Sequence, residues 1–316
     1  MLYFNSTNGL RKVFFACLLA LAGACGEEPN IRPGAFEVVE QHLEGKRCAA
    51  ANEDGIVVTE HFAAVIDGAT AKSDFTPDSK TTGRMAMEIV AQTVRMLPPD
   101  INAQGAMERI TAALHDFYVA HNLLADLERE PGRRLTANGV IYSAARREVW
   151  QVGDCQVLMG RIYSRNEKAI DGIMSEARAA MIEAMLARGM SPDQICEADP
   201  GRALIAPFLA VQAVLQNHPD PSQAYAFPVF DGFPIRMEQV NIFTAGPETE
   251  EIVLASDGYP EVLPTLSASE SRLAEILSRD PLCFREYRST KGVRPGCVSF
   301  DDRAYLRIRL INRFPK

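Results

Sequence analysis

The amino-acid sequence predicts an α+β protein whose strands form antiparallel sheets covered by helices. Expected strands and helices occur in blocks instead of alternating regularly, which argues against a parallel, Rossmann-type sheet. The 316 residues are 47% hydrophobic and 23% charged, as in globular proteins, so disordered and collagen-like architectures are excluded. No long linker, repeat or charge block follows Pro33, and one domain is therefore expected over residues 35–313.

The first half of this domain should contain six strands and two helices. Short runs rich in β-branched residues, bounded by turn residues, predict the strands. Apolar residues spaced three and four positions apart predict the helices. The expected strands are 36–43, 56–59, 62–66, 137–143, 148–152 and 156–162, and the expected helices are 83–97 and 103–128.

The second half begins with helices and ends with strands. A run rich in Ala and Met predicts a helix at 171–188, and shorter helices are expected near 202–216 and 269–278. The expected strands are 224–230, 239–244, 251–255 and 304–310.

Charge, cysteines and motifs exclude several classes of function. The net charge of −8 argues against nucleic-acid binding, for which a basic patch is the first requirement. Seven scattered cysteines contain no CxxC pair and no zinc-spaced Cys/His cluster, so neither a disulfide scaffold nor a structural zinc is expected. Dinucleotide-binding, P-loop, zinc-protease and nucleophile-elbow motifs are absent from the sequence.

The first 30 residues form a separate segment that resembles an export signal. Arg11 and Lys12 precede an apolar run at 13–24, which is shorter than the roughly 20 residues that span a bilayer. It fits a signal-peptide core, and residues 21–25 resemble a lipobox in which Cys25 carries a lipid anchor. The alternative is that translation begins downstream. The chain is then cytoplasmic instead of exported or lipid-anchored, and no transmembrane span is expected in the mature domain.

Acidic residues recur at the ends of expected strands, and a further acidic pair, Glu53–Asp54, lies at a turn. A carboxylate directly after a buried strand is costly to desolvate without a partner, and no Lys or Arg adjoins Asp67, Asp154 or Asp257. Any one of these acids could be a turn residue, but the repetition favours a divalent-cation site. Oxygen ligands select Mg²⁺ or Mn²⁺. The strand-end acids are Asp67, Asp154, Asp257 and Asp301.

Five short motifs occur in a fixed order and resemble those of the type-2C metal-dependent protein phosphatases. They are N-E-D at 52–54, D-G at 67–68, V-G-D at 152–154, L-A-S-D-G at 254–258 and D-D at 301–302. The resemblance covers about residues 36–310. It implies a four-layer α/β/β/α sandwich of two antiparallel sheets flanked by helices, with a helical insertion at about 170–228 that would shape the substrate surface.

The resemblance also implies a dinuclear Mn²⁺ or Mg²⁺ centre. Asp67 would bridge both ions, and Asp257 and Asp301 would hold the first. Glu53 and the Gly68 carbonyl would hold the second. The implied reaction is hydrolysis of a phosphomonoester by a hydroxide that bridges the two metals, without a phosphoenzyme.

Two further acids have implied roles near this centre. Asp154 would bind a weaker third ion together with Asp257. Asp54 would orient metal-bound water without binding metal directly. The implied substrate is a protein carrying phosphoserine or phosphothreonine, and the chain is expected to act as a monomer.

The sequence departs from the family pattern after the bridging aspartate and before the N-E-D motif. The bridging aspartate is followed by G-A-T-A instead of G-x-G-G, and Ala69 stands where some members have a histidine. Ala49 occupies the position of the usual phosphate-binding arginine. Arg47 is a substitute, and Arg133 or Arg134 is an alternative.

These departures leave other functions open. The chain could be an inactive pseudophosphatase or a regulatory metal-binding module. It could also be an exported protein whose metal site is structural, or a hydrolase of a small phosphorylated metabolite.

Overall fold

The computed structural model describes residues 35–47, 51–69 and 80–311, which contain two five-stranded sheets. All neighbouring strands in both sheets run antiparallel. The first sheet has the order β1(Phe36–Glu44), β10(Arg303–Leu310), β9(Glu251–Ala255), β6(Gln156–Met159) and β7(Ile162–Ser164). The second has the order β2(Asp54–Val58), β3(Phe62–Ala69), β4(Thr136–Ser143), β5(Glu148–Val152) and β8(Asn241–Thr244).

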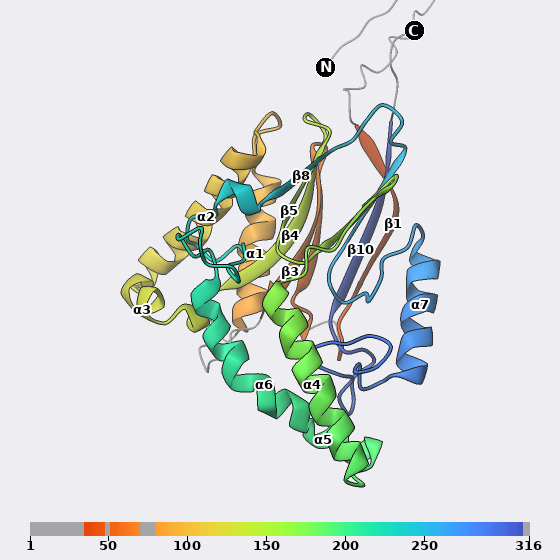
Figure 1. Ribbon diagram of the computed structural model, residues 1–316. Coiled ribbons are helices and arrows are strands. Elements are labelled where there is room, and N and C mark those ends of the chain that lie inside the picture. The colour runs from red at the N-terminus through yellow and green to blue at the C-terminus, as the bar shows by residue number, and fades with distance from the viewer. Residues whose placement is uncertain (1–34, 48–50, 70–79, 312–316) are drawn as a thin grey trace, which may run out of the picture. The chain divides into compact units, whose positions relative to one another are not determined.

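The two sheets pack face to face, as Figure 1 shows. Side chains from both sheets form one apolar layer, to which Val65 and Tyr142 contribute from the second sheet and Leu254 and Leu306 from the first. The alternate residues of β3, such as Ile66, point to the opposite face of their sheet. Because β3 is buried on both faces, its sequence is continuously apolar instead of alternating.

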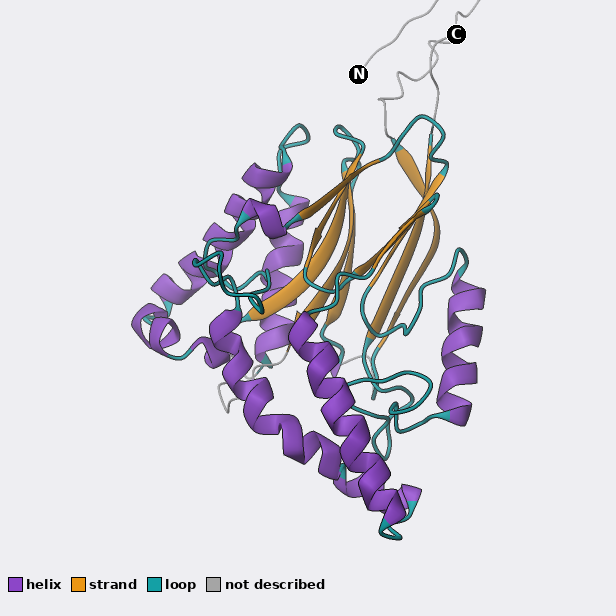
Figure 2. Cartoon of the chain, in the orientation of Figure 1, coloured by secondary structure: helices purple, strands orange, loops and turns teal. Residues whose placement is uncertain are grey.

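Helices cover the outer face of each sheet, and Figure 2 shows the resulting layers. The second sheet packs against α1(Thr82–Arg95) and α2(Ala103–Ala120), while the first packs against α7(Leu266–Arg279). The side chains of Thr81, Asn102 and Thr265 accept hydrogen bonds from backbone N–H groups in the first turns of these helices. The predicted α/β/β/α sandwich is confirmed.

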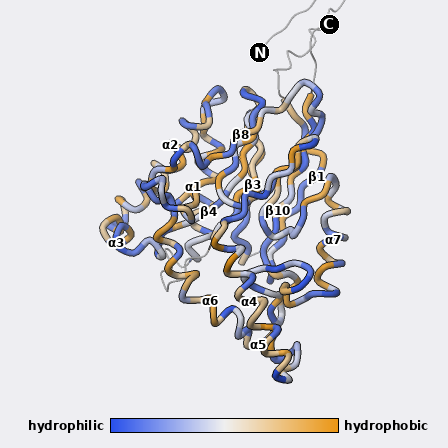
Figure 3. Tube along the Cα trace, viewed as in Figure 1, coloured by the Kyte–Doolittle hydropathy of each residue, from blue (hydrophilic) through white to orange (hydrophobic). Residues whose placement is uncertain are grey.

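The segment predicted as a helical insertion, 170–228, contains three helices. They are α4(Ala169–Ala187), α5(Pro192–Ala198) and α6(Pro200–Val211), and a 3-10 turn, Gln212–Leu215, follows them. Figure 3 shows that hydrophobic residues recur along α6, and Leu204, Phe208 and Val211 are exposed there. The helices are tied to the loop at 282–289 by Arg178, whose side chain is 1% exposed.

Three predicted elements are each divided into two in the structure. The helix expected at 103–128 is divided into α2 and α3(Leu124–Arg129) because Asn122 adopts a positive φ of 56°. The strand expected at 156–162 is the hairpin β6–β7, which turns at Gly160 with φ 58°. The helix expected at 202–216 ends at Val211 and continues as the 3-10 turn.

The strand expected at 224–230 is wrong. This segment makes only isolated bridges, from Phe227 to Gln216 and from Phe230 to Ala137. Pro228 cannot donate to a ladder. The backbone of Val229 bonds instead to the side chain of Asn217, donating to Oδ1 at 3.1 Å and accepting from Nδ2 at 2.8 Å. A side chain therefore replaces a neighbouring strand.

None of the helices within the described ranges is long and apolar enough to cross a membrane. The predicted signal-like segment at 1–30 and its Cys25 lie outside the described residues.

Candidate metal centre

Strand ends from both sheets bring the predicted acids together. Asp54 opens β2 and pairs in register with Asp67 on β3, while Asp154 follows β5 in the same sheet. Asp257 follows β9 of the facing sheet. One oxygen each from Asp67, Asp154 and Asp257 lies within 4.8 Å of the other two. The strand-end pattern pointed to a cation site wherever such ends meet, and these three ends do meet.

Crowded negative charge perturbs these carboxyl groups. Burial, and then repulsion from Asp154 and Asp301, raises the pKa of Asp67 to about 6. Burial, and then repulsion from Asp67, also raises the pKa values of Asp54 and Asp257 well above their usual range. A bound cation would remove this repulsion.

Two buried carboxylate oxygens of this group, Asp54 Oδ2 and Asp154 Oδ1, have no hydrogen-bond partner among the residues that the structure describes. Buried polar atoms are normally satisfied by protein, water or an ion. The Asp67 carboxylate is fixed from the side by Asn138, whose Nδ2 donates to Oδ2 at 3.1 Å. Unpaired oxygens on a fixed carboxylate scaffold suit a divalent cation.

Glu53 and Gly68 meet at the beginning of α1. The Gly68 N–H donates to the Glu53 carbonyl at 3.2 Å. A Cβ added to Gly83 would lie 2.8 Å from both Glu53 Oε1 and the Gly68 carbonyl oxygen. These two oxygens therefore converge, and the hydroxyl of Thr81 donates to Glu53 Oε1. Only glycine at position 83 permits this close approach.

Asp301 also reaches the site, but its oxygens are bound by lysines. Lys46 Nζ lies 3.0 Å from Oδ1, and Lys291 forms an ion pair with Oδ2. Burial alone would raise the pKa of Asp301, but Lys291 and Lys46 outweigh it and lower that pKa to about 2. The chain itself thus supplies positive charge to Asp301.

Sequence reasoning missed these lysines and Asp302. Asp302 accepts hydrogen bonds from the backbone nitrogens of Lys46 at 2.8 Å and Glu53 at 3.2 Å. Lys168 forms a third ion pair, in which its Nζ lies 2.7 Å from Asp154 Oδ2. The one signal in the sequence was that no Lys or Arg adjoins the strand-end acids, so their counter-charge had to come from elsewhere.

Of the arginines predicted to bind phosphate, Arg134 lines the cavity beside Asn138 and Lys168, but its guanidinium pairs with another acid. Arg47 is exposed, and within the described ranges no hydrogen bond or ion pair joins it to the site carboxylates. Arg134 is buried, pairs with Asp231 at 3.0 Å and stacks over the Phe233 ring at 3.6 Å. Arg133 lies 3.7 Å from Glu130. Lys46, the neighbour of Arg47, points into the site instead.

The donors fit hard divalent cations. We call the following seven residues the acidic cluster: Glu53, Asp54, Asp67, Asp154, Asp257, Asp301 and Asp302. Three lysines, Lys46, Lys168 and Lys291, pair with it. Seven carboxylates less three ammonium groups leave four negative charges, which two divalent cations would balance.

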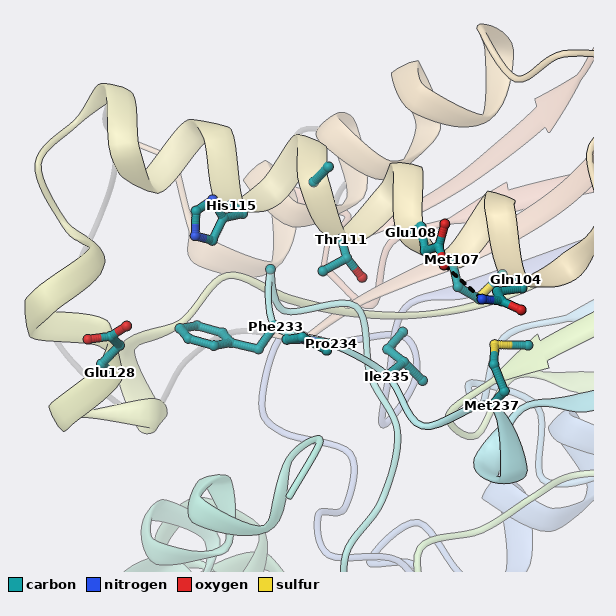
Figure 4. Close-up of a pocket in the computed structure, with 12 residues that line it drawn as sticks. Gln104, Met107, Glu108, Thr111, His115, Glu128, Phe233, Pro234, Ile235 and Met237 are labelled. Atoms are coloured by element: carbon teal, nitrogen blue, oxygen red, sulfur yellow. Dashed lines mark hydrogen bonds between the residues drawn. The ribbon is translucent and has the colours of Figure 1, made fainter. Parts of the chain in front are cut away.

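One small cavity adjoins the acidic cluster, and a larger pocket lies away from it. A cavity of about 90 Å³ borders it and is lined by Ala69, Asn138 and Lys168 together with residues of α6. A larger apolar pocket of about 560 Å³ lies between α2 and the segment 232–237, and its lining contains neither the cluster residues nor Asn138 and Lys168, which bind them. Figure 4 shows its walls, which include Met107, Thr111, His115, Phe233, Ile235 and Met237.

No protein-family model and no curated protein matches the chain by sequence. Its structure is similar to several solved structures. The serine/threonine phosphatase PstP/Ppp of Mycobacterium tuberculosis is 14% identical with a TM-score of 0.44, over 87% of this chain and 99% of that one. A PstP catalytic domain with two manganese ions is also 14% identical, with a TM-score of 0.43 over 88% and 99%. Stp1 of Staphylococcus aureus is 12% identical, with a TM-score of 0.44 over 90% and 99%. At these values the similarities carry no functional conclusion.

Proposed function

We propose that this protein is a metal-dependent phosphomonoester hydrolase that acts on phosphoserine or phosphothreonine in proteins. One observation carries the proposal. Oxygens of Asp67, Asp154 and Asp257 converge within 4.8 Å at strand ends from both sheets, in a strongly negative environment. Such an all-oxygen site suits Mn²⁺ or Mg²⁺.

The acidic cluster divides into two sets of metal donors. Asp67, Asp154 and Asp257 would hold one ion, while Glu53 and the Gly68 carbonyl, near Asp67, would hold the second. Asp301 was expected to be a ligand of the first ion, and in this role its oxygens would be shared between the metal and the two lysines. When bound, two such ions supply an activated water and neutralise the phosphate.

The remaining groups orient the reactants. Asp54 Oδ2 has no partner within the described part of the chain and would accept a hydrogen bond from an attacking water. Lys46 and Lys291 bring two positive charges to the edge of the cluster, where they would bind phosphate oxygens. Asn138 holds the Asp67 carboxylate in position.

The size of the adjoining cavity supports a protein substrate. A cavity of about 90 Å³ is far smaller than the roughly 300–1,000 Å³ of typical small-molecule pockets. The body of the substrate would therefore stay at the surface, as a phosphorylated side chain on a protein does. A small phosphorylated metabolite remains the alternative substrate.

The pairing of Asp301 favours a second candidate function. With both oxygens bound by lysines, the chain could be a pseudophosphatase that binds metal without turnover. If Asp301 stays paired with its lysines, the affinity of the site for one metal ion would fall, while the fold would be unchanged.

Turnover and metal binding must be measured on the same sample. The full 316-residue chain is assayed with p-nitrophenyl phosphate, a phosphothreonine peptide and a sugar phosphate, in Mn²⁺, Mg²⁺ or EDTA. Calorimetry records Mn²⁺ binding. Metal-dependent hydrolysis of the peptide supports the proposal, and preference for the sugar phosphate selects the metabolite reading. Mn²⁺ binding without turnover selects the pseudophosphatase. A chain that binds no Mn²⁺ is neither a protein phosphatase, nor a metabolite phosphatase, nor a pseudophosphatase of this kind.

A further inference from the structure

Lys168 forms an ion pair at the position predicted for the third metal ion. Asp154 was expected to hold that ion with Asp257, but Asp154 Oδ2 accepts from Lys168 Nζ at 2.7 Å. The Lys168 side chain is 13% exposed, and its Nζ also lies 3.6 Å from Asp171. The ring of Phe227 lies 5.4 Å from the same nitrogen, within cation–π range.

The charge of Lys168 is stabilised by its surroundings. Burial alone would lower the pKa of this lysine, but attraction to Asp154 and Asp171 outweighs it and raises the pKa above the ordinary value. Asp257 contributes in the same direction. The ammonium group thus lies between two carboxylates, at 2.7 Å from Asp154 and 3.6 Å from Asp171, and both favour its charged form.

A lysine is not favoured at this position of the helix, although it pairs with Asp171 in the first turn. Lys168 is the N-cap of α4, where Ser, Thr, Asp or Asn is preferred, and its side chain makes no capping hydrogen bond. Its positive charge also opposes the positive end of the helix dipole. The ion pair with Asp154 accounts for a residue that the local structure disfavours.

The segment before α4 holds Lys168 against the cluster. Asn166, in a left-handed conformation with φ 46°, donates from Nδ2 to the carbonyl of Gly153 at 2.9 Å. Arg165 donates to the Pro260 carbonyl at 2.9 Å and to the Tyr287 hydroxyl at 2.6 Å. Both attachments lie close in sequence to the predicted ligands Asp154 and Asp257, so the lysine and these ligands are positioned together.

We propose that the ammonium group of Lys168 takes the place of a third divalent cation, so that the centre binds two ions and not three. The inference rests on the proposed function. Asp154 Oδ2 is paired with the lysine, and Oδ1, which has no hydrogen-bond partner among the described residues, would bind one of the two ions. The internal cation also ties α4 to the metal centre, because Lys168 is the residue that begins this helix.

Metal stoichiometry tests the inference without relying on activity. The full chain, Lys168→Ala and the charge-conserving Lys168→Arg are dialysed against increasing Mn²⁺, and bound metal is measured by mass spectrometry. We expect two equivalents in the wild type and in Lys168→Arg, and three in Lys168→Ala. Without metal, Lys168→Ala should have a lower Tm than the wild type, and Mn²⁺ should raise its Tm by more.

Each other outcome has a defined meaning. Three equivalents in the wild type, or only two in folded Lys168→Ala, overturn the inference and leave the proposed function intact. No bound Mn²⁺ in the wild type overturns the proposed function and the inference with it. If Lys168→Ala does not fold, Lys168→Gln is used with the same criteria, because it keeps the length of the side chain without the charge.

Discussion

The carboxylate of Asp302 accepts a hydrogen bond from the backbone nitrogen of Glu53 at 3.2 Å, although 249 residues separate them in sequence. The same carboxylate also accepts from the backbone nitrogen of Lys46. Asp302 therefore fixes both a predicted metal ligand and a lysine that enters the site. Its role is to position these residues, which explains why two consecutive acids precede β10.

Replacing Asp302 should loosen both partners. Because Asp302→Ala leaves buried N–H groups without an acceptor, we expect a loss of about 2–4 kcal/mol in the free energy of unfolding. Mn²⁺ affinity should fall as well, because Glu53 is no longer held. Asp302→Asn retains one acceptor oxygen and should lose less than half as much. Urea unfolding and Mn²⁺ titration provide the two readouts, and equal behaviour of the two variants would refute this role.

Asp67→Asn should separate metal binding from folding. In EDTA the variant should be at least as stable as the wild type, because the substitution removes a charge repelled by Asp154 and Asp301. In Mn²⁺ at about 100 times the dissociation constant, the wild type should gain about 2.7 kcal/mol per site, or roughly 5–10 °C in Tm. The variant should gain little. Thermal unfolding tests this, and an equal gain in both proteins would contradict it.

Lys46→Met and Arg47→Met distinguish the observed phosphate-binding candidate from the one predicted from sequence. We expect Lys46→Met to raise the KM for p-nitrophenyl phosphate about tenfold, equivalent to about 1.4 kcal/mol of lost binding. Its Mn²⁺ affinity should rise, because Asp301 Oδ1 is released. Arg47→Met should change neither quantity. Steady-state kinetics and Mn²⁺ titration measure them, and the opposite ranking would restore Arg47 as the phosphate ligand.

Arg178→Met should detach the helical insertion from the loop at 282–289. The variant leaves Asp199 and three backbone carbonyl groups without their donor, so we expect a loss of about 3–5 kcal/mol. Arg285→Met is the matched control, because its pair with Glu183 is solvent-exposed and should contribute almost nothing. Urea unfolding compares the two. Similar losses in both variants would show that burial of the Arg178 pair is not the cause.

Most of the fold could be predicted because strands and helices each leave a recognisable pattern in residues that are adjacent in sequence. The continuous apolar run at 62–66 indicates a buried strand, and the periodic run at 83–97 indicates a helix. Acids that directly follow strands come together when those strand ends lie at the same edge of the sheets. The strand expected at 224–230 failed because Pro228 cannot donate and the side chain of Asn217 binds the backbone of Val229 in place of a neighbouring strand. Local pattern contains no sign of such a replacement.

The charge pairing of the site could not be predicted in the same way. Lys46 and Asp301 lie 255 residues apart, and no periodicity connects them. The sequence did indicate that the strand-end acids needed counter-charge, and we interpreted this need as metal alone. In the structure, three lysines supply part of it. Long-range ion pairs depend on how two sheets pack, which a reading of adjacent residues does not describe.

The most direct test of the central claim measures Mn²⁺-dependent hydrolysis of a phosphothreonine peptide by the full chain beside Asp67→Asn. Calorimetry on the same samples records bound Mn²⁺. A phosphatase centred on the acidic cluster should turn over only with metal, and Asp67→Asn should remain folded while losing both tight Mn²⁺ binding and turnover. Full activity in Asp67→Asn, or equal turnover in EDTA, would contradict the assignment of this cluster as the catalytic centre.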